Sequence, residues 1–343
     1  MSTITGQEMN VSRSKDESRN AGRRTVLKVG LAGLATPFLV RFSSAAAAYP
    51  DRPIKLLVPF GVGGPVDIVA RVMAPLLGEI LGGSVFVENK PGASGNLGTG
   101  AAARAEPDGY TVLVAASNFV INKILFAKIP YDPIADFIPL VELAETPSAF
   151  GVRPELGAKN LKEFVEIAKS KSFSYSHPGF GTVSHMAGEV LKSRAGINMV
   201  AATHNGGGPA VQTLMTGAVE FCSAALPALH PHVKSGLVVG LGVTSAKRWP
   251  DLAEMPTVEE AGFPDFDLAN FTALLVPAQT PLEIVDRVSK ASLEILQRPD
   301  VQSKLLTLGF AVTARPPSVL KARLERELPF WKNVVATAGI KPT

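Results

Sequence analysis

Three glycine-rich loops contain the residues of this chain whose types and spacing could do chemistry: 60–65, 177–184 and 205–209. Each follows a short apolar run and precedes a helical pattern, and Gly64 and Pro65 suit the cap and first position of the first of these helices. Free backbone N–H groups at a helix start attract an anion, and none of the loops contains lysine or arginine. The pattern therefore predicts a carboxylate held by hydrogen bonds and helix dipoles, unless each loop is only a strand-to-helix turn.

Polar side chains beside the loops refine this prediction. Thr182 or Ser184 is the natural cap of the second helix. Asp67 falls at the third helical position, where the helix dipole favours a carboxylate; facing the ligand instead, it would repel a carboxylate and favour an amine or amide. His185 and His204 are expected near the ligand as hydrogen-bond donors, because no nucleophile is evident for them to activate.

Motifs for catalysis or metal binding are absent or incomplete. Residues 92–95 (Gly-Ala-Ser-Gly) place the second glycine one residue too early for a nucleophile elbow, and 61–63 lack the third glycine of a dinucleotide fingerprint. Cys222 lies in an apolar strand pattern, which favours a buried, inert thiol. The histidines of 230–232 are separated by proline in an expected loop, a poor scaffold for a metal. We therefore predict no catalysis, cofactor or metal.

The elements that must position the loops alternate between strands and helices. Strand patterns fall at 54–58, 84–88, 110–115, 173–176, 199–203, 219–222 and 237–243. Helical patterns fall at 68–81, 161–169, 186–194, 210–216, 282–297, 299–308 and 317–338, and an alanine-rich helix follows the glycine loop at 91–98. Strands apolar on both faces, alternating with helices, predict an α/β fold whose sheet is mostly parallel and covered on both sides. The length of 343 residues favours two domains.

The charge of the chain is concentrated in residues 1–48. This segment holds seven of the 34 Lys and Arg and three of the 30 Asp and Glu, so the remainder carries 27 of each and shows no bias toward nucleic acid. Gly22-Arg23-Arg24-Thr25-Val26-Leu27-Lys28, a short apolar segment at 29–40 and the small residues of 43–48 resemble a twin-arginine export signal. An amphipathic core helix is the alternative, but its glycines and Pro37 oppose it. Cleavage near Ala48 would place the mature protein in the periplasm.

Ordered motifs along the mature chain resemble the Bug family, the extracytoplasmic solute receptors of tripartite tricarboxylate transporters. The matching segments are Tyr49 to Ile54, Val58-Pro59-Phe60 with Gly63-Gly64 and Asp67, Val87 to Ala93, Pro107 to Thr111, Pro130 to Pro133, Asp136-Phe137, Val243 to Ser245 and Pro256 to Gly262. The resemblance implies a type II periplasmic binding protein fold, α/β, with two lobes that close on a small carboxylated solute.

The resemblance also implies how the lobes and the site are built. The first lobe would combine 49–146 with 245–343, the second would span 147–244, and the hinge would cross near 146–152 and 240–245. The ligand would lie between the first loop and a second-lobe loop at 176–185. The candidate ligand-binding residues are Phe60, Gly61, Val62, Gly63, Gly64, Asp67, Asn118, Ser176, Gly179, Gly181, Thr182, Ser184, His185, Thr203, His204 and Phe271.

Three positions depart from the family pattern at expected pocket walls. Gly61-Val62 stands where similar proteins have two prolines, His204-Asn205-Gly206 where a Tyr-Lys-Gly segment is common, and Phe271 where tryptophan is common. These departures suggest a ligand different from the dicarboxylates and aspartate that some relatives bind.

The predicted function is therefore a monomeric periplasmic receptor without catalysis. Its ligand would be a small organic acid, with an amide or amino acid as alternatives, and its partners the membrane permease subunits of a tripartite tricarboxylate transporter. Two other functions stay open: a ligand sensor for a signalling partner, and a hydrolase or isomerase on a similar α/β scaffold.

Overall fold

The computed structural model describes residues 49–343. The predicted leader, residues 1–48, lies outside the described residues. No helix within residues 49–343 combines the length and the apolar character needed to cross a bilayer.

The chain begins with a repeated unit of strand, loop and helix. Its elements are β1 (Ile54–Val58), α1 (Pro65–Leu81), β2 (Val85–Asn89), α2 (Asn96–Ala103), β3 (Thr111–Ala116) and α3 (Asn118–Leu125). β1 and β3 are apolar on both faces and almost wholly buried, as strands between two layers of helices must be. Gly64 caps α1 and Pro65 is its first residue, as predicted, because proline's fixed φ suits that position and its missing N–H costs nothing there.

A long strand leads into a second unit of the same kind. Its elements are β4 (Phe137–Val152), α4 (Leu161–Lys169), β5 (Phe173–His177), α5 (Val183–Ala195), β6 (Met199–Thr203), α6 (Gly207–Met215), β7 (Phe221–Ala225), α7 (Leu226–Lys234) and β8 (Val239–Val243). The chain closes with β9 (Ala269–Pro277), α8 (Leu282–Gln297), α9 (Pro299–Thr307), β10 (Ala311–Arg315) and α10 (Pro317–Thr337).

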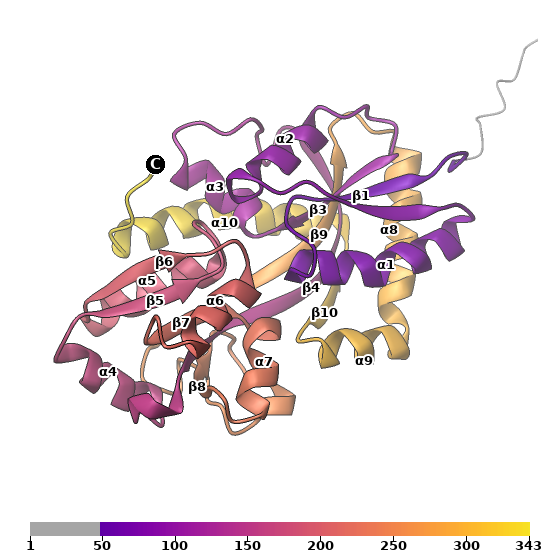
Figure 1. Cartoon of the computed structure of the whole chain (residues 1–343). Coiled ribbons are helices and arrows are strands. Elements are labelled where there is room, and N and C mark those ends of the chain that lie inside the picture. Colours follow the sequence, from indigo (N-terminus) through magenta and orange to yellow (C-terminus); the bar gives the residue numbers. More distant parts are fainter. Residues whose placement is uncertain (1–48) are drawn as a thin grey trace, which may run out of the picture. The chain divides into compact units, whose positions relative to one another are not determined.

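One mixed sheet organises both units (Figure 1). Its strand order is β2-β1-β3-β9-β4-β7-β5-β6, and β8 and β10 also pair with β4. The outer strands pair in parallel, as predicted: β1 with β2 and β3, and β5 with β6 and β7. The central pairs are antiparallel, because β9 returns between β3 and β4. β1 therefore occupies the same place in its half of the sheet as β5 does in the other, and the loops that follow these two strands are equivalent.

β4 belongs to both halves of the sheet. It pairs with β9 from Phe137 to Pro147 and with β7 from Ser148 to Val152. The partner strand thus changes between two adjacent residues without interrupting β4.

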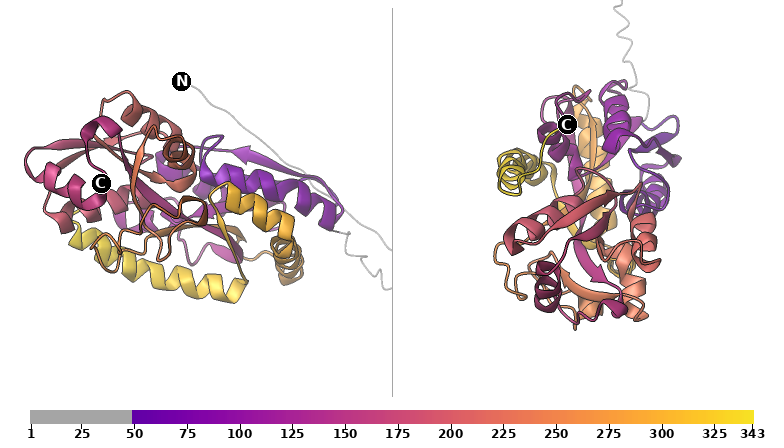
Figure 2. Two further views of the ribbon diagram at one scale, coloured as in Figure 1. Left: turned by 90° about the horizontal axis from the view of Figure 1, so that it is seen from below. Right: turned by 60° about the vertical axis from the view of Figure 1, so that its left-hand side comes forward.

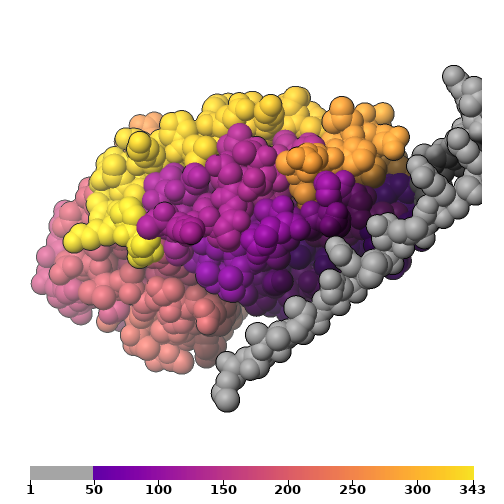
Figure 3. All heavy atoms as spheres, turned by 90° about the horizontal axis from the view of Figure 1, so that it is seen from above, coloured from indigo at the N-terminus to yellow at the C-terminus, as the bar shows by residue number. Residues whose placement is uncertain are grey.

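Two helices connect the buried cores of the two halves. The cluster around α5 contains Ile121 and Leu125 of α3 together with Trp331 and Val335 of α10. The earlier part of α10 belongs instead to a cluster with β3 and β9. α10 (yellow) accordingly runs along the molecule in Figure 2 and lies next to segments from both units at the surface seen in Figure 3.

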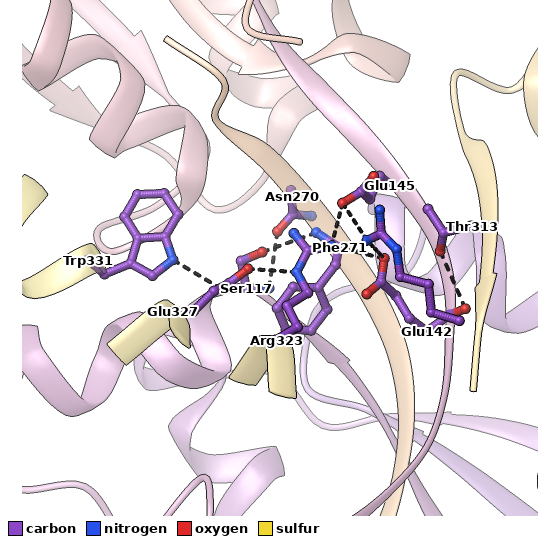
Figure 4. Close-up of polar contacts among 10 residues, drawn as sticks. Ser117, Glu142, Glu145, Asn270, Phe271, Thr313, Arg323, Glu327 and Trp331 are labelled. Carbon is purple, nitrogen blue, oxygen red and sulfur yellow. Dashed lines mark hydrogen bonds and ion pairs between the residues drawn. The ribbon is translucent and has the colours of Figure 1, made fainter. Parts of the chain in front are cut away.

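A charged network ties α10 to β4 (Figure 4). The guanidinium of Arg323 donates through Nη1 to Oε1 of Glu142 at 2.9 Å and also to Glu145, and through Nε to Oε1 of Glu327 at 2.8 Å. Trp331 donates its indole N–H to Oε2 of Glu327 at 3.1 Å. Burial lowers the pKa of Arg323, but the three carboxylates outweigh burial and raise it.

The sequence patterns missed or misplaced several elements. Residues 230–232, expected in a loop, lie inside α7, whose interior accommodates Pro231. Gly206 caps α6, which begins at Gly207, three residues before the predicted start at 210, and Pro209 stands in its first turn. β4, β9 and β10 had no predicted counterpart. In β4, the buried Glu142 and the prolines Pro139 and Pro147 weaken the strand pattern.

Candidate ligand-binding site

The first loop joins β1 to α1 and presents backbone donors to its surroundings. Gly61 and Val62 are exposed, Val62 to 74%. The first intrahelical hydrogen bond of α1 is donated by Ile68 to the carbonyl of Gly64, so the amides of Val66 and Asp67 have no backbone acceptor within the helix. These amides are the unpaired helix-start donors that the sequence predicts.

Asp67 holds this loop in shape. Its side chain is 1% exposed and accepts three hydrogen bonds: from Gly63 N at 2.9 Å, Arg71 Nε at 2.8 Å and Asn89 Nδ2 at 2.9 Å. Burial raises the pKa of Asp67, but the hydrogen bonds from Arg71, Gly63 and Asn89 outweigh burial and hold the pKa below its usual value. The carboxylate is thus charged, paired with Arg71 and occupied by donors of the protein.

A strained loop and α3 form a wall beside the first loop. Ser94 has a φ of 54°, in the left-handed region, and its carbonyl accepts from Asn118 Nδ2 at 2.5 Å and Asn122 Nδ2 at 2.9 Å. A Cβ atom on Gly95 would lie 3.2 Å from the Phe60 ring and 3.1 Å from Asn118 Nδ2. Phe60 and Asn118, both predicted site residues, therefore lie close together. Strained backbone of this kind collects at ligand-binding sites.

The second loop approaches the same helix. Thr182 caps α5, as predicted, and accepts from the backbone N–H of His185 at 3.2 Å. A Cβ atom on Gly181 would lie 2.9 Å from Asn122 Oδ1, a buried atom without a hydrogen-bond partner among the described residues. α3 thus contacts the wall of the first loop through Asn118 and the second loop through Asn122.

Two buried histidines support the second loop. Nδ1 of His177 accepts from Gly179 N at 3.3 Å, and Nδ1 of His185 accepts from Gly181 N at 3.4 Å. Their ring centroids are 4.4 Å apart. Burial, with His185 nearby, lowers the pKa of His177 to about 3, and burial, with Lys192 nearby, lowers the pKa of His185 to about 4. Both rings are therefore neutral at pH 7, with the proton on Nε2 and Nδ1 free to accept.

The third loop lies beside the second. His204 N donates to the carbonyl of His177 at 3.0 Å, and Gly206 N to that of Pro178 at 2.9 Å. The His204 ring contacts Ala202 O through Nδ1 at 2.9 Å. Thr203 is exposed, and its hydroxyl lies 3.1 Å from Nε2 of His177.

Three predicted site residues lie behind the loop surface. Ser176 is fully buried and donates its hydroxyl to Ala210 O at 2.8 Å. The hydroxyl of Ser184 is paired with that of Ser148 at 2.8 Å. Phe271 lies in the core, 0% exposed, under the guanidinium of Arg323. Their side chains are thus occupied within the protein, which leaves only backbone groups at these positions for a ligand.

Sequence reasoning missed His177, Ser94 and Asn122. Asn122 could have been found, because it lies one helical turn after Asn118 and so on the same face of a helix. His177 ends β5 in front of the loop, yet a lone histidine in that place gives no sign that it is buried against a second histidine. The positive φ of Ser94 has no signal in the sequence, since serine rarely adopts it.

A surface cavity lies away from the three loops. It has a volume of about 480 Å³ and is formed between β4, β10 and α10, with Glu145, Arg323 and Phe330 in its walls. Two of its three arginines, Arg315 and Arg323, already pair with Glu142, Glu145 and Glu327, so the loops remain the candidate site.

The fold and the paired loops define a class of protein. A mixed sheet that is shared by two equivalent α/β units, with helix-start loops after corresponding strands, is the architecture of periplasmic binding proteins. A solved structure described as the periplasmic binding protein BugD matches with a TM-score of 0.80 at 32% identity, over 85% of this chain and 99% of that chain.

The chain belongs to the tripartite tricarboxylate transporter family receptors, whose family model matches residues 69–337. Protein BugT of Bordetella pertussis is 30% identical over 91% of this chain and 95% of its own length. Rpa4515 of R. palustris, solved with adipate, has a TM-score of 0.83 at 30% identity, over 86% of this chain and 100% of that chain. MatC of Rhodopseudomonas palustris, solved with malate, has a TM-score of 0.78 at 32% identity, over 84% of this chain and 100% of that chain. The Bug-family resemblance is thereby confirmed.

Proposed function

We propose that this protein is a periplasmic receptor that captures a small carboxylated solute between two lobes and delivers it to the membrane subunits of a tripartite tricarboxylate-type transporter. One observation carries the proposal: two equivalent loops at the ends of β1 and β5 each open a helix whose first amides have no intrahelical acceptor. Helix-start amides bind carboxylates without a charged side chain.

The charges around the loops favour an acid as ligand. The Asp67 carboxylate is paired with Arg71 at 2.8 Å, and the two histidines of the second loop are neutral, so no uncompensated negative charge of the protein faces the ligand. Because Arg71 neutralises the Asp67 carboxylate, this residue no longer favours an amine over an acid as the ligand. The structural neighbours solved with adipate and malate make dicarboxylates the first ligands to test.

Closure would use the strands and segments that cross between the halves. We place the first lobe at 49–146 with 245–343 and the second at 147–244, with β4 and the segment at 240–245 as crossings. The backbone supports this division, because Ser148 and Thr244 are joined by a hydrogen bond from Thr244 N to Ser148 O at 2.9 Å and another from Ser148 N to Thr244 Oγ1 at 2.9 Å. Closure would exclude water and strengthen each amide–carboxylate bond.

The test is ligand binding to the mature protein, measured by calorimetry and thermal shift. The probes are adipate, malate, an aromatic monocarboxylate, and the amide and amine analogues of adipate. A ligand at 100 times its Kd should stabilise the protein by about 2.7 kcal/mol. Stabilisation by amines and not by acids would contradict the proposed ligand class, and turnover of any probe would indicate an enzyme instead.

Gly61 offers a matched pair of variants. A Cβ atom at this position would meet no other atom within 4 Å, so both Gly61→Ala and Gly61→Asp should fold normally. Only Gly61→Asp places a negative charge beside the helix start, and we expect it to weaken acid binding at least tenfold while Gly61→Ala stays close to wild type. Equal affinities of the two variants would remove the first loop from the site.

Export and delivery need separate measurements. Fractionation of cells that carry wild type or an Arg23→Lys/Arg24→Lys leader tests the periplasmic location and the twin-arginine route. Uptake of a bound acid by cells with and without the transporter's membrane subunits tests delivery. Binding without any effect on uptake would favour a sensor role.

A further inference from the structure

The two loops have the same backbone at their helix starts. Gly63 and Gly181, each directly before the cap residue, have φ of 79° and 76°. The cap residues Gly64 and Thr182 have φ and ψ of −74° and 164°, and −73° and 155°. The two loops therefore share one backbone conformation at the cap residue and at the residue before it, although they share little sequence.

The same hydrogen bond closes both loops. In the first, the third helical residue Asp67 accepts from Gly63 N at 2.9 Å. In the second, the third helical residue His185 accepts through Nδ1 from Gly181 N at 3.4 Å. A left-handed glycine thus gives its N–H to a side chain four residues later in each half of the protein.

The residue one helical turn after this acceptor is positively charged in the first half of the protein and negatively charged in the second. Arg71 follows Asp67 by four residues and neutralises it. Glu189 follows His185 by four residues; its carboxylate accepts from Tyr175 Oη at 2.6 Å and lies 3.3 Å from Lys192 Nζ. An aspartate at position 185 would therefore stand one helical turn from a second carboxylate and be repelled by it, whereas a neutral imidazole is not repelled.

We propose that His185 is the positioning residue of the second loop, holding the Gly181 amide as a neutral acceptor in the way that Asp67 holds the Gly63 amide as a charged one. Each acceptor matches its neighbour: a carboxylate beside Arg71, an imidazole beside Glu189. With both glycine amides occupied by the protein, the amides that remain for a ligand are those of the first helical residues, among them Val66 and Ser184.

The surroundings of His185 keep its ring neutral. His177 lies against it, with ring centroids 4.4 Å apart, and the Phe180 ring lies 5.1 Å away. The charged groups that face the pair are Lys192 and Glu189, with His204 near His177. A cation at His185 would have no acceptor on Nδ1, because that atom faces the Gly181 N–H.

The first test needs no ligand. Nitrogen NMR of the His185 ring should show the Nε2–H form with no titration between pH 8 and 5. Hydrogen exchange of the Gly181 amide should accelerate about 3- to 10-fold in His185→Ala and return toward wild type in His185→Asn, whose side-chain oxygen can accept the same bond. His232→Asn is the matched control and should leave this exchange unchanged.

The second test measures affinity for adipate and malate, and its meaning rests on the proposed function. His185→Asp should lose about 10- to 100-fold in affinity, since it adds a negative charge beside Glu189 and the ligand. His185→Asp/Glu189→Arg rebuilds the arrangement of the first loop and should recover part of this loss.

The outcomes separate the two proposals. An Nδ1–H ring, or Gly181 exchange that is unchanged in His185→Ala, overturns the positioning role whatever the ligand. The expected exchange pattern in a protein that binds neither adipate nor malate supports the positioning role and rules out these two dicarboxylates as ligands. Equal affinity of His185→Asp and His185→Asn for a bound acid contradicts the charge matching.

Discussion

Replacing Arg323 by methionine should destabilise the protein much more than an ordinary surface substitution. Arg323 is the centre of the network in Figure 4, with contacts to Glu142, Glu145 and Glu327. Its side chain is 11% exposed, and that of Glu142 is fully buried. Methionine keeps most of the volume and removes the charge, so Glu142 and Glu145 would keep only Arg315 as a cation and Glu327 would lose its ion pair.

The expected loss in free energy of unfolding depends on which hydrogen-bond and ion-pair partners the three glutamates keep. Removing one partner of a buried ion pair costs about 3–5 kcal/mol. Arg315 still binds Glu142 Oε1 at 2.6 Å, and Trp331 still binds Glu327, so we expect the lower end of that range, about 3 kcal/mol. At an unfolding entropy of about 2.1 cal/mol/K per residue, the roughly 295 residues of the mature chain would convert this loss into a Tm about 5 °C lower.

Urea unfolding of wild type, Arg323→Met and Arg326→Met gives the comparison. Arg326 is exposed on the same helix and forms no ion pair among the described residues, so its variant should stay within about 0.5 kcal/mol of wild type. The deficit of Arg323→Met should shrink as pH falls from 7 to 5, because the crowded carboxylates then take up protons in the folded state. A loss below 1 kcal/mol, or one independent of pH, would refute the reasoning.

Three further predictions concern the second loop and the core. The pKa values of His177 and His185 fall from 6.5 to about 3 and about 4 on folding, so the unfolded chain takes up protons first as pH drops below 6.5. Urea unfolding should therefore show the free energy of unfolding falling toward pH 4.5. A free energy of unfolding that does not change with pH would contradict neutral histidines. Gly181→Ala should cost more stability than Gly157→Ala, since both have positive φ but only the first meets other atoms, 2.9 Å and 3.2 Å away; equal losses in unfolding experiments would argue against that contact. Cys222 should resist thiol reagents until the protein unfolds, because burial raises its pKa to about 12.

The sequence was sufficient for elements whose own residues determine them. The helix at 161–169 is predicted to the residue, because Asn160 caps it and its apolar residues repeat on one face. The loops after β1 and β5 were found for the same reason: glycine, proline and a hydroxyl mark a helix start locally.

What the sequence could not supply depends on partners distant in the chain. β4 reads poorly as a strand because Glu142 is buried in it, and its compensating cations come from Arg315 and Arg323, more than 170 residues later. The same holds for His185, whose contacts with the His177 ring and the Gly181 amide come from packing and have no local sequence signal. The residues next to Glu142 and His185 in the sequence do not predict roles that depend on tertiary contacts.

The change of pairing partner along β4, from β9 to β7, has a mechanical consequence for the proposed lobe movement. Because pairing passes from β9 at Pro147 to β7 at Ser148 with no unpaired residue between, the crossing is a hydrogen-bonded ribbon and not a free joint. Rotation of one proposed lobe against the other would then add twist to the hydrogen-bonded strand β4, which would resist it elastically. Register shifts at 142–144 and 150–151 lie on either side of this change of partner, at the places where a ladder yields most easily. If the lobes close on a ligand as proposed, this added twist would oppose closure and would favour return to the open angle when the ligand leaves.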